Sequence, residues 1–121
     1  MMRAWKGASV VLVTGVILAS SLPALTERSA PARVPPITWR GVRYEVNHAK
    51  MGIVEAREAG SGKLLWERKI YSVFYLPLLE KDVQDVYITS LSLRGTRLLI
   101  VDEKKRVYEL DPVTRKVRRI K

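Results

Sequence analysis

VEAREAGSGKLLW, residues 54–66, is the stretch of sequence that decides the fold. Apolar and charged side chains alternate from Val54 to Arg57, which is the period of a half-buried β-strand. The turn sequence GSG follows at residues 60–62, and KLLW then begins a second strand-forming run. The stretch therefore predicts a β-hairpin with Trp66 on the inward face of its second strand.

A similar hairpin pattern returns 53 residues later, as VYELDPVTRKV at residues 107–117. In each copy the acidic residue of the corner is placed to accept backbone N–H bonds from residues two or three ahead, and a hydroxyl residue makes a second local bond. The matching pairs are Val54 with Val107, Glu58 with Asp111, Ser61 with Thr114, Lys63 with Lys116, and Leu64 with Val117.

The position after the hydroxyl residue needs a positive φ angle, which glycine adopts at no steric cost. Gly62 meets this need in the first copy. Arg115 stands at the same place in the second copy, where a left-handed backbone costs a non-glycine residue about 1 kcal/mol. The second corner is therefore expected to be either strained or shaped differently.

The remaining sequence after residue 36 also favours strands, because short alternating runs are separated by turn signals. No alternation of strands with helices is visible, which argues against a parallel α/β domain. We predict an all-β domain, a small antiparallel meander or sandwich of about seven strands. The predicted strands cover residues 41–47, 52–59, 63–71, 82–93, 97–103, 106–111 and 116–121.

Residues 1–25 have the pattern of an export segment. Arg3 and Lys6 precede a run without charge from Ala8 to Leu25. This pattern is typical of a cleaved signal peptide, and its length also suits an apolar helix that stays as an N-terminal membrane anchor. Either interpretation predicts that the rest of the chain is exported, to be secreted, periplasmic or anchored to the membrane.

The exported part divides into a proline-rich linker, residues 26–36, and the β-domain, residues 37–121. The chain has no cysteine, which excludes disulfides and a lipid-modified lipoprotein.

The exported part is strongly basic. Residues 31–121 hold 19 Lys and Arg against 11 Asp and Glu, and the last nine residues hold five basic side chains and no acidic one. Such a surface attracts anionic membranes, polyanions or acidic proteins, whereas export argues against nucleic acid. The basic candidates for partner binding are Arg115, Lys116, Arg118 and Arg119.

The sequence offers little chemistry for catalysis. With one histidine and no cysteine it cannot build a metal site rich in those ligands, and it has neither a phosphate-binding glycine loop nor a nucleophile motif. We therefore predict a protein that is not an enzyme, with no catalytic, cofactor-binding or metal-binding residues. The alternative is a small calcium or enzymatic site around Asp82, Asp85 and His48.

The two hairpin stretches resemble single repeats of the pyrroloquinoline-quinone-type β-propeller family. The first carries the pattern Val-x-Ala-x-acid-x-x-Ser/Thr-Gly-Lys-Leu-Leu-Trp, with Trp66 at the family's blade-docking position, whereas the second lacks the Gly and the Trp. The resemblance implies blade-like hairpins. The family's propellers bind quinone in dehydrogenases and serve as scaffolds in outer-membrane assembly proteins. The quinone chemistry needs a whole ring of blades, so only the hairpin is carried over.

We expect the domain to act as a non-catalytic protein-binding or structural module at the cell envelope, with a protein partner or a second copy. The segment at residues 73–79 is too apolar for an ordinary loop, and Pro77 interrupts it. The expected contact residues, besides the basic ones, are Trp66, Phe74, Tyr75 and Leu76. A basic module that binds polyanions or a membrane surface is the other alternative.

Overall fold

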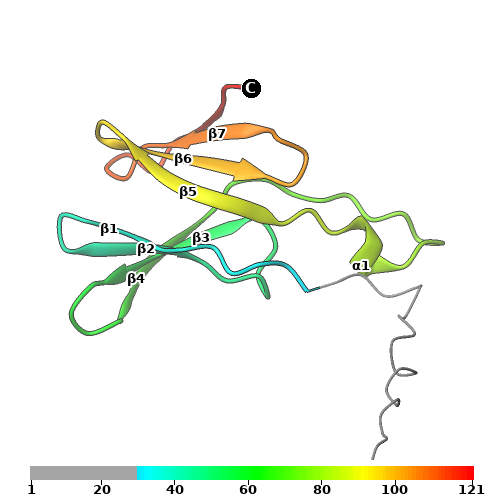
Figure 1. Cartoon of the computed structure of the whole chain (residues 1–121), viewed down its shortest axis with the longest axis horizontal. Coiled ribbons are helices and arrows are strands. Elements are labelled where there is room, and N and C mark those ends of the chain that lie inside the picture. The colour runs from blue at the N-terminus through cyan, green and yellow to red at the C-terminus, as the bar shows by residue number, and fades with distance from the viewer. Residues whose placement is uncertain (1–29) are drawn as a thin grey trace, which may run out of the picture.

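The computed structural model describes residues 30–121, apart from the side chain of Asp82, and shows two four-stranded antiparallel sheets (Figure 1). Each sheet is a meander in which neighbouring strands follow each other in the sequence. The first sheet contains β1 (Ile37–Trp39), β2 (Val42–Val46), β3 (Ile53–Glu58) and β4 (Leu64–Lys69). The second contains β5 (Ile88–Arg94), β6 (Arg97–Asp102), β7 (Val107–Leu110) and β8 (Val117–Arg119). One helical turn, α1 (Lys81–Gln84), lies between β4 and β5.

The prediction of an all-β antiparallel fold is confirmed, with eight strands in the described residues in place of about seven. The additional strand is β1, which is only three residues long and pairs with β2. The predicted strand over residues 82–93 is wrong in its first half, because residues 81–84 are helical and β5 begins at Ile88. The predicted N-terminal helix lies outside the described residues.

One apolar layer fills the space between the two sheets. Its buried side chains come from both sheets and also include Val34, which lies before the first strand. The members of this layer are Val34, Tyr44, Val54, Ala56, Ile70, Ile88, Leu91, Leu98, Ile100, Tyr108 and Leu110. Neither sheet therefore has a separate core, and the two sheets stabilise each other.

The two matching hairpins bury opposite faces. Val54 and Ala56 of β3 are fully buried in the shared layer. Their counterparts 53 residues later, Val107 and Glu109, lie on the other face of β7, whose buried residues are Tyr108 and Leu110. If a two-fold axis related the two sheets, both hairpins would bury the same face. Because they bury opposite faces, the sheets are instead packed head to tail. Each sheet consequently keeps one open face.

The two corners have the same backbone shape. In the first, Glu58 and Lys63 form a backbone bond and Gly62 has φ +77°. In the second, Asp111 and Lys116 form the equivalent bond and Arg115 has φ +64°. The prediction of a strained second corner is therefore correct, and the differently shaped alternative is excluded.

The side-chain bonds of the corners match the expectation in part. The Asp111 carboxylate accepts the N–H groups of Val113 and Thr114, as expected. Glu58 has a longer side chain and accepts the hydroxyl of Ser61. In both corners the hydroxyl oxygen accepts the N–H of the residue two positions ahead.

Three glycine-to-alanine variants test how the backbone is fixed. Gly52 has φ +71°, and an added Cβ would lie 2.3 Å from the carbonyl oxygen of Tyr71. Gly62 has a positive φ, but there is room for a methyl group on its Cα. Gly60 has no positive φ, and an added Cβ there would meet no atom within 4 Å. We expect Gly52→Ala to lower the free energy of unfolding by about 3 kcal/mol or more, and Gly62→Ala by about 1 kcal/mol. Urea denaturation measures both.

Gly60→Ala is the control for this series and should leave the urea midpoint nearly unchanged, because nothing lies within 4 Å of its added Cβ. Equal losses in all three variants would contradict the backbone assignment.

Candidate functional site

The loop between β4 and β5 carries the largest exposed apolar side chains of the described residues. Phe74 is 85% exposed and Leu78 is 95% exposed. Leu76, Leu79 and Val83 each expose half of their side chains or slightly more. Figure 1 shows this loop projecting beyond the ends of both sheets, beside α1. We call Phe74, Leu76, Leu78, Leu79 and Val83 the apolar tip.

Gln84 fixes the shape of this loop from within. Its Oε1 accepts the N–H of Leu76 at 2.6 Å, and its Nε2 lies within hydrogen-bond distance of the carbonyl oxygens of Leu76, Leu79 and Glu80. The side chain thereby satisfies backbone groups that no strand neighbour pairs. This also explains why residues 81–84 do not continue as a strand, since the Gln84 side chain is turned back toward the loop.

A second set of bonds anchors the loop to the start of β5. The hydroxyls of Tyr75 and Tyr87 donate to the two carboxylate oxygens of Asp85. The bond to Asp85, together with burial, raises the pKa of Tyr75 to about 12. Tyr75 is therefore held inward as a half-buried anchor, while its neighbours Phe74 and Leu76 point to solvent.

The inner side of the loop borders a groove of about 590 Å³. Apolar side chains of the tip line one part of it, and Lys104 and Arg106 from the turn between β6 and β7 line another. Lys81 adds a cation beside the loop, with its ammonium group 5.1 Å from the ring centre of Tyr75. The tip is thus apolar at its end and bordered by cations.

The base of the loop is tied to the second sheet by a buried polar cluster. The Asp102 carboxylate is inaccessible to solvent and accepts bonds from the Arg106 guanidinium and the Tyr108 hydroxyl. The rings of Tyr71 and Tyr108 stack at 5.4 Å, and the Tyr71 hydroxyl donates to the carbonyl oxygen of Val86. Burial is the main cause that raises the pKa of Tyr71, so its hydroxyl remains a donor at neutral pH. Both ends of the loop are therefore fixed.

The chain enters the domain at the same end as the loop. His48 Nε2 lies 3.0 Å from the carbonyl oxygen of Ala32, and the His48 ring packs edge-on against the ring of Tyr87. Tyr87 in turn shares Asp85 with Tyr75 of the loop. These contacts place residue 32 next to the elements that anchor the apolar tip.

The alternative site around Asp82, Asp85 and His48 receives little support from this geometry. Asp85 accepts two phenol hydroxyls, and His48 faces a backbone carbonyl and a tyrosine ring. In residues 30–121, with the Asp82 side chain left out, no group of three or more His, Cys, Asp or Glu side chains is close enough to hold a metal ion. No helix of this part of the chain is long and apolar enough to span a bilayer.

Trp66 lies at the junction of the two sheets, in agreement with the prediction that it faces inward. Its ring packs edge-on against Tyr44, and the guanidinium of Arg115 lies 4.8 Å from the ring centre. Arg68 donates to the carbonyl oxygen of Arg115 across the same junction. Of the expected contact residues, the half-buried Trp66 and the exposed Arg115 thus contact each other within the chain, whereas Phe74 and Leu76 belong to the apolar tip.

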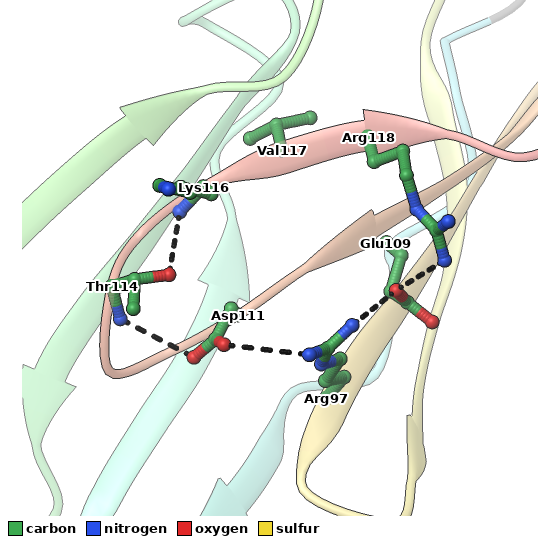
Figure 2. A pocket seen from close by; sticks show the side chains of 7 residues that line it. All are labelled: Arg97, Glu109, Asp111, Thr114, Lys116, Val117 and Arg118. Carbon is green, nitrogen blue, oxygen red and sulfur yellow. Dashed lines mark hydrogen bonds and ion pairs between the residues drawn. The ribbon is translucent and has the colours of Figure 1, made fainter.

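The remaining basic candidates do not share one face. Arg118 lies on the open face of the second sheet, where it and Arg97 contact Glu109 at 3.0 and 2.9 Å from either side (Figure 2). Arg119 pairs with Tyr108 in the register and so points to the opposite face. Lys116 lines the same open cleft of about 610 Å³ as Arg118. The hydrogen bonds from Arg97 and Arg118 lower the pKa of Glu109.

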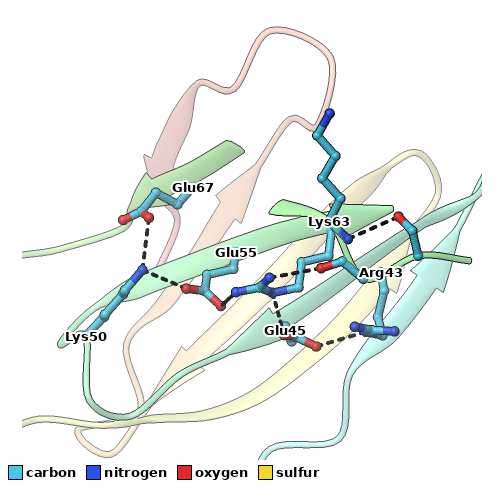
Figure 3. A network of polar contacts seen from close by, with 9 residues as sticks. Arg43, Glu45, Lys50, Glu55, Lys63 and Glu67 are labelled. Atoms are coloured by element: carbon cyan, nitrogen blue, oxygen red, sulfur yellow. Dashed lines mark hydrogen bonds and ion pairs between the residues drawn. The ribbon is translucent and has the colours of Figure 1, made fainter. Parts of the chain in front are cut away.

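The open face of the first sheet carries a charge network that the sequence pattern did not reveal (Figure 3). Glu45, Glu55 and Glu67 are neighbours across β2, β3 and β4. Glu55 is only 1% exposed and is bound by Lys50 at 2.9 Å and by Arg57 at 3.1 Å. Strand alternation indicates that these residues face away from the core, but only the register places the three carboxylates in one row.

Sequence reasoning placed Leu78 and Leu79 in the apolar segment 73–79 without naming them individually as contact residues, and it missed Val83 and the role of Gln84. The signal for Leu78 and Leu79 was present, because they continue the apolar run past Pro77. Val83 was assigned to a strand, and nothing local marks Gln84 as the residue that bonds to the loop.

No protein-family model matches this chain, and a search of curated proteins finds no match.

Replacing Gln84 tests whether the loop is held in shape. Gln84→Ala should make the Leu76 amide exchange with solvent faster, since that N–H loses its acceptor. The free energy of unfolding should fall by about 1 kcal/mol. Hydrogen exchange followed by NMR measures the first effect. Thr89→Ala removes a side-chain to backbone bond outside the loop and is the control. Unchanged exchange at Leu76 in Gln84→Ala would refute the role given to Gln84.

The buried Glu55 predicts a specific pH dependence. Burial alone would raise its pKa, but the bonds from Lys50 and Arg57 outweigh it and the pKa is lowered. Such a carboxylate stabilises the fold above its unfolded pKa of about 4.3, and this stabilisation is lost as pH falls through the lower folded value. Glu55→Gln should cost about 1–3 kcal/mol at pH 7, with a smaller difference from the parent in acid.

Chemical denaturation across a pH series measures the Glu55 effect. Glu67→Gln is the matched control, because Glu67 is bound by the same Lys50 but is 38% exposed and should cost less than about 1 kcal/mol. A gap between Glu55→Gln and the parent that stays constant from pH 7 to acid would contradict the assignment.

Proposed function

We propose that this chain is an exported, non-catalytic docking module of the cell envelope and that the apolar tip of the β4–β5 loop is its contact surface. The observation that carries the proposal is the exposure of Phe74 and Leu78 on a loop whose backbone is fixed. Burying a side chain of this kind contributes about 1.5–3 kcal/mol. Phe74 and Leu78 can gain close to this amount, and Leu76, Leu79 and Val83, which are already about half buried, add smaller contributions.

The fixed shape of the loop supports a docking role. A loop that orders only on binding loses conformational entropy at that moment, which weakens the association. Gln84, Tyr75 and Asp85 hold the β4–β5 loop in one shape before any partner arrives. The apolar tip is therefore preorganised for binding, and its exposure does not result from a flexible loop.

The distribution of polar groups supports a binding role over a catalytic one. The buried carboxylates Glu55 and Asp102 are each held by cations of the same chain. Of the two acids of the alternative site, only the side chain of Asp85 is described, and it accepts the hydroxyls of Tyr75 and Tyr87. The groups that would activate a substrate are thus occupied by internal partners.

Blade-like architecture belongs to the same proposal. Two successive four-stranded meanders, packed head to tail with Trp66 at their junction, support the resemblance to blades of quinone-type propellers. We propose that the two sheets serve here as a rigid support for the loop, without quinone chemistry.

Site-specific photo-crosslinking in cells that produce the full chain tests this function. A photoreactive phenylalanine analogue at Leu78 should give adducts with a partner molecule, whether that partner is a protein or a lipid. The same analogue at Val113, which is 79% exposed at the distant 111–116 corner, is the matched control and should give none. Adding Phe74→Ser to the chain that carries the photoreactive analogue at position 78 should reduce the adducts. Equal reaction at both positions, or none at Leu78, would overturn the proposal.

A further inference from the structure

We propose that the apolar tip inserts into the interface of a lipid bilayer, so that the β-domain lies against the membrane with the β4–β5 loop facing the lipid. This inference rests on the proposed docking function and names the partner that the loop contacts. Three features of the molecule favour a lipid surface over a second protein: the form of the tip, the place where the chain enters the domain, and the cations around the loop.

The form of the tip suits a bilayer. Its most exposed side chains, Phe74 and Leu78, stand at the end of a projecting loop (Figure 1). A protein partner would need a matching pocket for such a projection, whereas the boundary between headgroups and acyl chains accepts apolar side chains without a fixed complementary shape. Tyr75, half-buried beside them, places an amphipathic ring at the level where aromatic side chains are favoured in membranes.

The position of Ala32 brings the tip to the membrane. The uncharged run Ala8–Leu25 ends seven residues before Ala32, which is at most about 25 Å of extended chain. His48, whose ring packs against Tyr87, contacts Ala32 at the end of the domain that carries the loop. If the run occupies a bilayer, the short connection keeps this end of the domain, and not the distant corner with Val113, next to the membrane surface.

The charges around the loop are arranged to tolerate headgroups. Lys81 and Lys104 are exposed beside the tip. Of the nearby carboxylates, Asp85 and Asp102 are turned inward to tyrosine hydroxyls and to Arg106, and Glu103 accepts the N–H of Tyr87, whereas Glu80 is exposed. The domain as a whole is basic, with 19 Lys and Arg against 11 Asp and Glu in residues 31–121, so anionic lipid attracts it. Lipid phosphates would meet the two lysines once the tip is inserted.

The absence of cysteine allows a direct test on the full chain. Leu78→Cys and, as matched control, Val113→Cys are each labelled with an environment-sensitive nitrobenzoxadiazole dye and reconstituted in phosphatidylcholine vesicles with or without phosphatidylglycerol. We expect the dye at Leu78 to shift to the blue, brighten several-fold and be quenched by nitroxide-labelled lipids. The dye at Val113 should keep its emission in water. Phe74→Ser should reduce the quenching at Leu78.

The dye reports how deeply position 78 itself lies in the bilayer, so the result does not depend on whether residues 8–25 anchor the chain. Water-like emission at Leu78 in vesicles would overturn the lipid inference. A blue shift that depends on protein concentration without vesicles would also overturn it, and would identify a second copy at the tip. Both results leave the docking function standing, provided that the Leu78 crosslinks form; loss of those crosslinks would remove the function itself.

Discussion

Neither sheet of this protein has a core of its own, because each buries only one face and buries it against the other. Val54 and Ala56 from the first sheet and Leu98 and Ile100 from the second are completely inaccessible to solvent. A described domain of about 90 residues is small for a single core, so a shared layer concentrates the available apolar area in one place. The orientation of every other element follows from this contact.

The head-to-tail relation of the sheets explains what lies on the outside. Because matching hairpins bury opposite faces, the open face of the first sheet is the one that Glu55 occupies, and the open face of the second is the one that Glu109 occupies. Glu55 is bound by Lys50 of the preceding turn and by Arg57 of its own strand, and Glu109 is bound by Arg97 and Arg118 of the neighbouring strands. The acids of these faces are therefore satisfied within the chain, and in the described residues the β4–β5 loop is where the exposed apolar side chains of the tip gather.

The loop is long because it connects the outer strand of one sheet to the first strand of the next. Such a connection must cross the end of both sheets, where strand neighbours cannot pair its backbone. Gln84 and Asp85 provide the missing bonds from side chains, and Tyr71 and Tyr108 join the base of the loop to the shared layer. The same contacts that close the fold at this end hold the apolar tip out in solvent.

The sequence by itself determined the local structure. The alternation at Val54–Arg57, the turn at residues 60–62 and the paired corners predicted antiparallel strands, because each depends on neighbours along the chain. The apolar run at residues 73–79 indicated a contact surface for the same reason. The match of Arg115 with Gly62 predicted either a strained corner or a different shape, and the structure decided for the strained one. The strand β1 escaped because it is only three residues long, and the helical turn at Lys81 escaped because no sequence pattern shows that the Gln84 side chain bonds back to the loop. Only the tertiary structure decided which faces are buried, that three glutamates form one row, and that Ala32 lies beside the loop. These depend on register and packing between segments far apart in the sequence, which no local pattern encodes.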